Sequence, residues 1–178
     1  MRVVAGTHRG RVLKAPKGEQ TRPTSDRVRE ALFSILADSV EQASVLDLFA
    51  GSGALGIEAL SRGAASATFV DNAHAAIAAI DGNLEALGLV AEVLRMPALR
   101  ALACTPVGDR QYDLVFIDPP YRLASALGPE LLVALEPVLS PSARVVTESD
   151  RREPLALELP LQLERRYGDT LIRIHGAR

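Results

Sequence analysis

The chain has 178 residues, of which 48% are apolar and 24% are charged, as expected for one globular domain with its own core. No apolar run is long enough to span a membrane, and the first residues lack the apolar segment of a secretory signal. The single cysteine, Cys104, excludes an internal disulfide and is expected to be a small buried residue. The sequence therefore predicts a cytoplasmic protein with no metal site and no membrane contact, and nothing in it requires more than a monomer.

Charge is distributed unevenly along the chain. Residues 1–29 contain eight basic and two acidic side chains, a net charge of +6, whereas the remainder contains 12 basic and 20 acidic side chains, a net charge of −8. Such asymmetry indicates an end that binds a polyanion, joined to an acidic body. The alternative is a solvated basic face that has no partner.

The first residues predict a small basic β-hairpin. A turn from Gly6 to Gly10 separates short strand patterns at 2–5 and 11–14, and it places Arg9 and Arg11 at or near the tip. A linker that contains proline and glycine follows, through residue 20. This hairpin carries much of the positive charge of the basic end.

The first long helix is predicted to begin near Pro23, because proline and the hydroxyls of Thr24 and Ser25 are helix-start signals. Arg22, Arg27 and Arg29 lie around this start, where the helix dipole disfavours cations. An acidic or anionic partner is therefore expected for the arginines at this position.

The rest of the chain is organised around a glycine turn between a strand and a helix. Apolar residues 45–50 form the strand pattern, Gly51-Ser52-Gly53 interrupts it, and a helix pattern continues to Gly63. Glycine permits a sharp turn and a close approach to a ligand, and the helix N-terminus offers free N–H groups. This arrangement is typical of an α/β nucleotide-binding unit.

Two classes of cofactor compete for this turn. The spacing Gly51-x-Gly53-x-x-Gly56 matches the dinucleotide fingerprint, which would suit NAD and an oxidoreductase. Asp47, four residues before the first glycine, would repel a pyrophosphate but suits a ligand that carries an ammonium group. S-adenosylmethionine has an amino-acid end and no phosphate, so it is the favoured cofactor.

A second acid follows on the next predicted strand. Residues 67–71 form that strand and end in Asp71, 20 residues after Gly51, where an acid is placed to accept hydrogen bonds from ribose hydroxyls. A helix over 73–87, a third strand over 91–94 and a short helix after Pro97 are then predicted.

The fourth predicted strand ends in an unusual tetrapeptide. The buried apolar run 114–117 stops at Asp118-Pro119-Pro120-Tyr121. Two prolines cannot continue a central strand, and their carbonyls remain free to accept hydrogen bonds. Folding and packing rarely require these four residues at the end of a buried strand, so a functional role is predicted for them.

The remaining elements complete an α/β fold. A helix over 127–139, a fifth strand over 143–148 and a closing hairpin of strands 161–166 and 170–175 are predicted. Strands that alternate with helices and end in a hairpin predict a mostly parallel sheet with one antiparallel strand.

Three motifs together resemble one protein family. They are the stretch from Arg22 to Glu30, the stretch from Asp47 to Gly56, and Asp118-Pro119-Pro120-Tyr121. With the basic N-terminus they resemble the RsmD family, bacterial methyltransferases that modify the N2 amine of a guanine in 16S ribosomal RNA. The resemblance implies a Rossmann-like, S-adenosylmethionine-dependent methyltransferase fold with a seven-stranded sheet over residues 21–178. It also implies that residues 1–20 bind RNA, either free small-subunit RNA or an assembling 30S particle.

The resemblance further implies a role for each motif. Asp118 and a proline carbonyl would hold the target amine, and Tyr121 would stack on the base. Cofactor contacts are implied for Asp47, Phe49, Ala50, Gly51, Ser52, Gly53, Asp71 and Asn72; catalytic roles for Asp118, Pro119, Pro120 and Tyr121; and phosphate contacts for Arg9, Arg11, Arg22 and Arg27. Met96-Pro97 departs from the polar residue that often binds adenine there, so the adenine contact stays open.

Other acceptors remain open at this point. Similar proline-rich motifs serve methyltransferases of adenine N6 in DNA or RNA and of protein glutamine amides, although the basic hairpin favours a nucleic acid. A non-catalytic RNA-binding assembly factor of the same fold is a third alternative.

Overall fold

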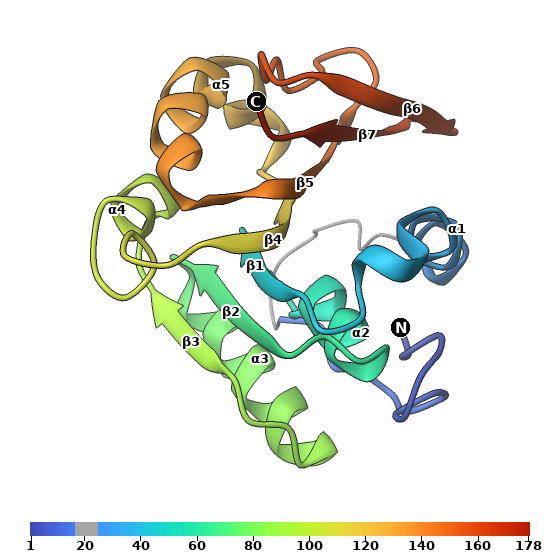
Figure 1. Ribbon diagram of the computed structural model, residues 1–178. Helices are drawn as coiled ribbons and strands as arrows, with labels where there is room; N and C mark the ends of the chain where they lie inside the picture. Colours follow the sequence, from blue (N-terminus) through green and yellow to red (C-terminus); the bar gives the residue numbers. More distant parts are fainter. Residues whose placement is uncertain (17–24) are drawn as a thin grey trace.

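The computed structural model describes residues 1–16 and 25–178. Within the second range, it describes the backbone but not the side chains of residues 121–126. Its centre is a sheet whose strands are, in chain order, β1 (Ser44–Leu48), β2 (Ser66–Asp71), β3 (Glu92–Arg95), β4 (Tyr112–Ile117), β5 (Leu139–Asp150), β6 (Leu161–Tyr167) and β7 (Thr170–Gly176). The seven strands lie in the order β3-β2-β1-β4-β5-β7-β6 (Figure 1). Neighbouring strands from β3 to β5 are parallel, and β7 is antiparallel to both β5 and β6. The predicted α/β fold with one antiparallel strand is confirmed.

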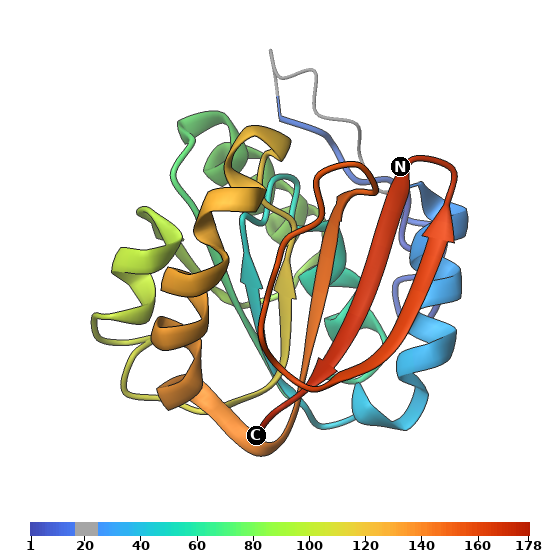
Figure 2. The ribbon, with the colours of Figure 1, turned by 90° about the horizontal axis from the view of Figure 1, so that it is seen from above.

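Helices cover both faces of this sheet (Figure 2). They are α1 (Asp26–Leu36), α2 (Ala54–Ser61), α3 (His74–Leu87), α4 (Ala98–Leu102) and α5 (Tyr121–Leu135), with short 3-10 helices η1 (Ala37–Ser39) and η2 (Glu136–Val138). Side chains alternate across β4, so that Leu114 and Phe116 join a core with α1, α2 and α3. Val115 and Ile117 join a second core with α4 and α5.

The largest difference from the predicted elements is in α5, which begins at Tyr121 and ends at Leu135 rather than spanning 127–139. Gly128 and Pro129 both lie inside the helix, although a proline usually ends or kinks one. Glycine is required there by packing, because a Cβ on Gly128 would lie 1.9 Å from the Ala156 carbonyl oxygen. Cys104 is also exposed rather than buried, because it follows the end of the short α4.

The N-terminal arm, residues 1–16, packs on the body of the domain. A single antiparallel bridge between Arg2 and Val12 takes the place of the two predicted strands. Val3 and Leu13 are only 1% and 4% exposed and lie in the same core as α1 and α2. The predicted boundary between hairpin and domain, at residue 20, lies outside the described residues, so this division stays a prediction.

A buried ion pair fastens the arm and α1 to α2. Arg29 and Glu58 are both fully buried, with Arg29 Nε 3.5 Å from Glu58 Oε2. The Glu58 carboxylate also accepts hydrogen bonds from the backbone N–H groups of Val4 (2.7 Å) and Ala5 (3.0 Å). The predicted acidic partner of an arginine at the start of α1 is therefore present for Arg29, which also contacts Asp26 Oδ1 at 2.9 Å.

Glu58→Gln should lower the free energy of unfolding, because it removes the buried partner of the Arg29 guanidinium and leaves it only the partly exposed Asp26 carboxylate. The loss should be about 3–5 kcal/mol, as is typical when one partner of a buried pair is removed. Urea unfolding measures it, with Glu30→Gln on the exposed side of α1 as the matched control. Equal stability of the two variants would contradict the role given to this pair.

Candidate functional site

The predicted site residues lie at the carboxyl ends of the central parallel strands. The chain order of the strands reverses between β1 and β4, and ligands of open α/β sheets bind at such a switch point. Asp47 lies near the end of β1, Asp71 ends β2, and Asp118 follows β4. The structure therefore brings together three acids that are far apart in the sequence.

The glycine turn has the backbone geometry that its sequence predicts. Gly51 and Gly53 have φ angles of 55° and 75°, and Gly53 is the residue that precedes α2. No atom lies within 4 Å of a Cβ built on Gly51, so this part of the turn faces open space. Gly56 is required for packing rather than for the turn. A Cβ built on it would lie 2.3 Å from the Phe69 ring and would force α2 away from β2.

Asp47 lies beneath this turn and is 2% exposed. Its Oδ2 accepts a hydrogen bond from the Gly56 N–H at 2.9 Å. Burial raises the pKa of Asp47 to about 8, helped by the nearby charge of Asp71 and opposed by the Gly56 hydrogen bond. A cationic group bound near this carboxyl would favour its ionised form, whereas a pyrophosphate would oppose it.

Asp71 joins the turn to the start of α3. Its Oδ2 accepts from the Gly51 N–H and its Oδ1 from the Ala73 N–H, both at 2.9 Å. Each carboxylate oxygen can accept a further hydrogen bond, and Asp71 is only half-buried, so contacts with ribose hydroxyls are sterically open to it. Asn72, which follows it, is exposed.

Asp118 stands beside a second carboxyl that the sequence analysis missed. Ile117 of β4 pairs with Thr147 of β5, so the next residues, Asp118 and Glu148, are neighbours across the two strands. Burial, then the charges of Glu148 and Asp47, raises the pKa of Asp118 well above its usual range. The available signal was an acid at the end of the fifth predicted strand, and Glu148 is only 5% exposed.

The two prolines after Asp118 differ in their surroundings. Pro119 is buried, whereas Pro120 is exposed and directly precedes α5. Tyr121 is the first residue of α5, and its side chain lies outside the described part of the structure. The turn from β4 into α5 therefore holds Asp118 at the edge of the sheet beside the glycine turn.

The arginines predicted to bind RNA fall into three groups. Arg9 and Arg27 are exposed. Arg11 is exposed too, but its Nη2 donates a hydrogen bond of 2.7 Å to the Ala86 carbonyl at the end of α3, where a cation also suits the helix dipole. Arg22 lies outside the described residues.

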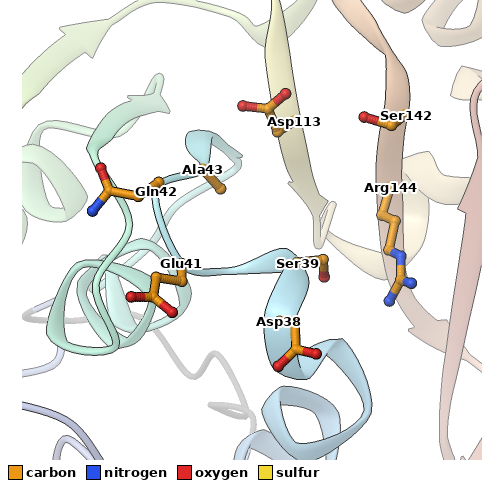
Figure 3. Close-up of a pocket in the computed structure, with 8 residues that line it drawn as sticks. All are labelled: Asp38, Ser39, Glu41, Gln42, Ala43, Asp113, Ser142 and Arg144. Atoms are coloured by element: carbon orange, nitrogen blue, oxygen red, sulfur yellow. The ribbon is translucent and has the colours of Figure 1, made fainter.

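One cavity among the described residues lies away from the predicted site. It has a volume of about 310 Å³ and opens at the amino-terminal edge of the sheet, the edge opposite the glycine turn (Figure 3). None of the predicted site residues lines it; its lining residues are Asp38, Ser39, Glu41, Gln42, Ala43, Asp113, Ser142 and Arg144. Asp113 there has structural partners, since it accepts hydrogen bonds from Ser44 N and Ser140 Oγ.

Two further searches of the described residues found nothing. They contain no group of three or more His, Cys, Asp or Glu side chains placed to hold a metal ion. No helix within them is long and apolar enough to cross a membrane.

Known proteins share both the sequence and the fold of this chain. The family model described as "Conserved hypothetical protein 95" matches residues 1–175. Ribosomal RNA small subunit methyltransferase D of Haemophilus influenzae is 37% identical over 87% of this chain and 81% of its own length. The same-named protein of Escherichia coli (strain K12) is 45% identical over 68% of this chain and 61% of its own length. The solved structure of yhhF from Escherichia coli superposes with a TM-score of 0.84 at 37% identity, covering 100% of this chain and 99% of that one.

The sheet order, the glycine turn and the acids at the strand ends define the class. The fold is that of the S-adenosylmethionine-dependent methyltransferases. The chain belongs to the RsmD family, to which the matching family model and the similar small-subunit enzymes correspond.

The raised pKa of Asp47 predicts how stability depends on pH. Between about pH 4 and about pH 8 the carboxyl is protonated in the folded protein and ionised in the unfolded chain, so the free energy of unfolding falls as pH rises through this window. Asp47→Asn keeps an acceptor for the Gly56 N–H and removes the titration. The variant should therefore gain stability relative to the unmodified protein as pH rises toward about 8 and gain no more above it.

Urea unfolding across this pH range tests the expectation. The exposed Asp81→Asn in α3 is the control and should change little. A stability difference between Asp47→Asn and the unmodified protein that stays constant with pH would contradict the assignment.

Proposed function

We propose that this protein transfers a methyl group from S-adenosylmethionine to the exocyclic N2 amine of a guanine in 16S ribosomal RNA. The coarser assignment, an rRNA methyltransferase, rests on family membership and on relatives named as small-subunit rRNA methyltransferases. The observation that supports transfer to an amine is that Asp118-Pro119-Pro120-Tyr121 follows β4, the neighbour of the strand β1 that leads into the glycine turn. The choice of guanine N2 among the possible amines rests on the resemblance to the RsmD family. An amine held there would meet a cofactor bound at the turn.

The residues of the turn fit this cofactor. Gly51 leaves open space for a ligand, and Asp47 and Asp71 offer carboxylates to an ammonium group and to ribose hydroxyls. When bound, S-adenosylmethionine supplies an electrophilic methyl group on a sulfonium. A pyrophosphate would gain no such partner from Asp47 and would oppose its ionisation, which argues against the NAD alternative.

Asp118 and the Pro119 carbonyl are the groups that would hold the amine. The N2 lone pair of guanine is delocalised into the ring, so it is a poor nucleophile until it is localised and aimed. Two acceptors that grip the two N–H bonds would orient the nitrogen, a contribution that can reach about 7–11 kcal/mol in well-aligned systems. Transfer would form the N–C bond while the bond between the methyl group and the sulfonium sulfur breaks, leaving S-adenosylhomocysteine. The nitrogen would become cationic, and ionised Asp118 would stabilise that charge and take one proton.

The base must leave its stack to reach these residues. Tyr121 would supply a stacking surface worth about 1–3 kcal/mol to an unstacked base. Arg9 and Arg27, which are exposed, and Arg22 would contact RNA phosphates. The partner of this surface is small-subunit RNA, either free or in an assembling particle.

Asp118→Ala should abolish methyl transfer while leaving cofactor affinity nearly unchanged, because Asp118 addresses the amine rather than the cofactor. Single-turnover methylation of small-subunit RNA and calorimetry with S-adenosylmethionine measure the two effects. Exposed Asp81→Ala is the control.

A near-normal rate in Asp118→Ala would remove Asp118 from the mechanism. Cofactor and RNA binding without methylation by the unmodified protein would favour a non-catalytic assembly factor, and methylated adenine or glutamine would identify the other acceptors.

Glu148 should set the pH at which Asp118 becomes active. Its negative charge helps to raise the pKa of Asp118, and the proposed acceptor is the ionised form. Glu148→Gln should therefore shift the rising limb of the single-turnover pH–rate profile to lower pH. Glu153→Gln, an exposed change beyond the same strand, should leave the profile in place. A profile that Glu148→Gln does not move would show that Glu148 does not tune Asp118.

A further inference from the structure

One buried side chain connects the cofactor turn to the N-terminal arm. Asn83 of α3 is 2% exposed. Its Oδ1 accepts a hydrogen bond from the Lys14 N–H at 2.8 Å, and its Nδ2 donates to the Lys14 carbonyl at 3.0 Å and to the Ser52 carbonyl at 2.9 Å. Both donors and the acceptor of the side-chain amide are thus used, and both backbone groups of Lys14 are engaged.

The partners of Asn83 belong to the two predicted binding elements. Ser52 is the middle residue of the glycine turn, and Lys14 is an exposed basic residue of the arm. Asp71 supports the turn too, by accepting a hydrogen bond from the Gly51 N–H. Asn83 therefore holds the position of the turn and the position of the arm at the same time.

The rest of the arm follows the same face of α3. Arg11 donates to the Ala86 carbonyl, and a ring nitrogen of His8 lies 3.2 Å from the Leu87 carbonyl. Positions 83, 86 and 87 are three and four residues apart and so share one side of the helix. Met1 adds a second contact with the turn, its sulfur lying 3.7 Å from Ser52 Oγ. A displacement of the basic arm would therefore also change its contacts with α3 and with the turn.

We propose that Asn83 is a positioning residue that links occupancy of the arm by RNA to occupancy of the turn by the cofactor, an inference that rests on the proposed function. RNA that contacts Arg9 and Lys14 fixes the arm, and the fixed arm keeps Ser52 in the arrangement that receives the cofactor. By linkage, the cofactor must then strengthen RNA binding by the same factor. A buried amide with a purely structural role would lower stability when removed but would leave no such mutual effect.

Calorimetry on the full chain tests this linkage, with S-adenosylhomocysteine as the probe because it cannot react. Its affinity is measured with and without a small-subunit rRNA transcript. In the unmodified protein the RNA should raise the affinity by about fivefold or more, the lower end of typical coupling factors. In Asn83→Ala the ratio should fall to about one, a complete loss of coupling.

Two further variants separate the parts of the contact. Asn83→Asp keeps the acceptor for Lys14 N–H but places a carboxylate against the Ser52 carbonyl, so it should also lose the coupling. Arg27→Ala in α1, outside the arm, should weaken RNA binding and lower its salt dependence by about one phosphate contact while keeping the coupling ratio. Glu85→Ala, on the exposed side of α3, is the matched control.

Hydrogen exchange of the unmodified protein gives an answer that does not depend on any variant folding. The probe should slow exchange of the amides of residues 11–15, because it fixes the turn to which Lys14 is hydrogen-bonded through Asn83. A coupling ratio of one in the unmodified protein, an unchanged ratio in both Asn83 variants, or unchanged exchange in the arm overturns the inference. Methylation of the same transcript separates the two levels: if guanine N2 is methylated, the proposed function survives that result, and if RNA is neither bound nor methylated, both fail.

Discussion

Removal of carboxyl groups from water is the constraint on which the site depends. Asp47 and Glu148 lie on β1 and β5, Asp118 directly follows β4 between them, and burial raises the pKa of both aspartates. The hydrogen bond from Gly56 to Asp47 offsets only part of this cost. A ligand that brings an ammonium group or N–H donors restores favourable partners to these acids, so the edge of the sheet is suited to such a ligand before any contact is specified.

The sequence predicted those parts of the site that depend on local signals. A strand, a glycine turn and a helix start are read from adjacent residues, and Gly51 and Gly53 adopt the positive φ angles that such a turn requires. Glu148 and Asn83 were missed because their importance comes from strand order and from contacts across the fold. Asn83 meets a partner 69 residues away in the sequence, and no periodic pattern reveals such a pairing. The predicted ends of α5 were wrong, because tertiary packing, as at Gly128, overrides local preference there.

The basic residues among the first 29 positions have two kinds of surroundings. Arg29 is buried against Glu58, and Arg11 lies on the end of α3, so part of the positive charge of the first 29 residues stabilises the fold. Arg9 and Arg27 remain exposed, and only such residues can contribute fully to attraction of a polyanion. Counting basic residues in the sequence therefore overstates the charge that a phosphate backbone would meet, although the sign of the basic end is unchanged.

The arm and the glycine turn form one structural unit. The turn contains three residues with positive φ, Phe49, Gly51 and Gly53, and a non-glycine residue in this region requires support from its surroundings. That support comes from Asp47 beneath the turn, from Asp71 at the end of β2, and from Asn83, whose other bonds hold Lys14. Because Val3 and Leu13 also lie in the domain core, the arm cannot move away without exposing apolar surface. The basic end is thus part of the framework that holds the glycine turn, so two separate signals in the sequence lie in one part of the fold.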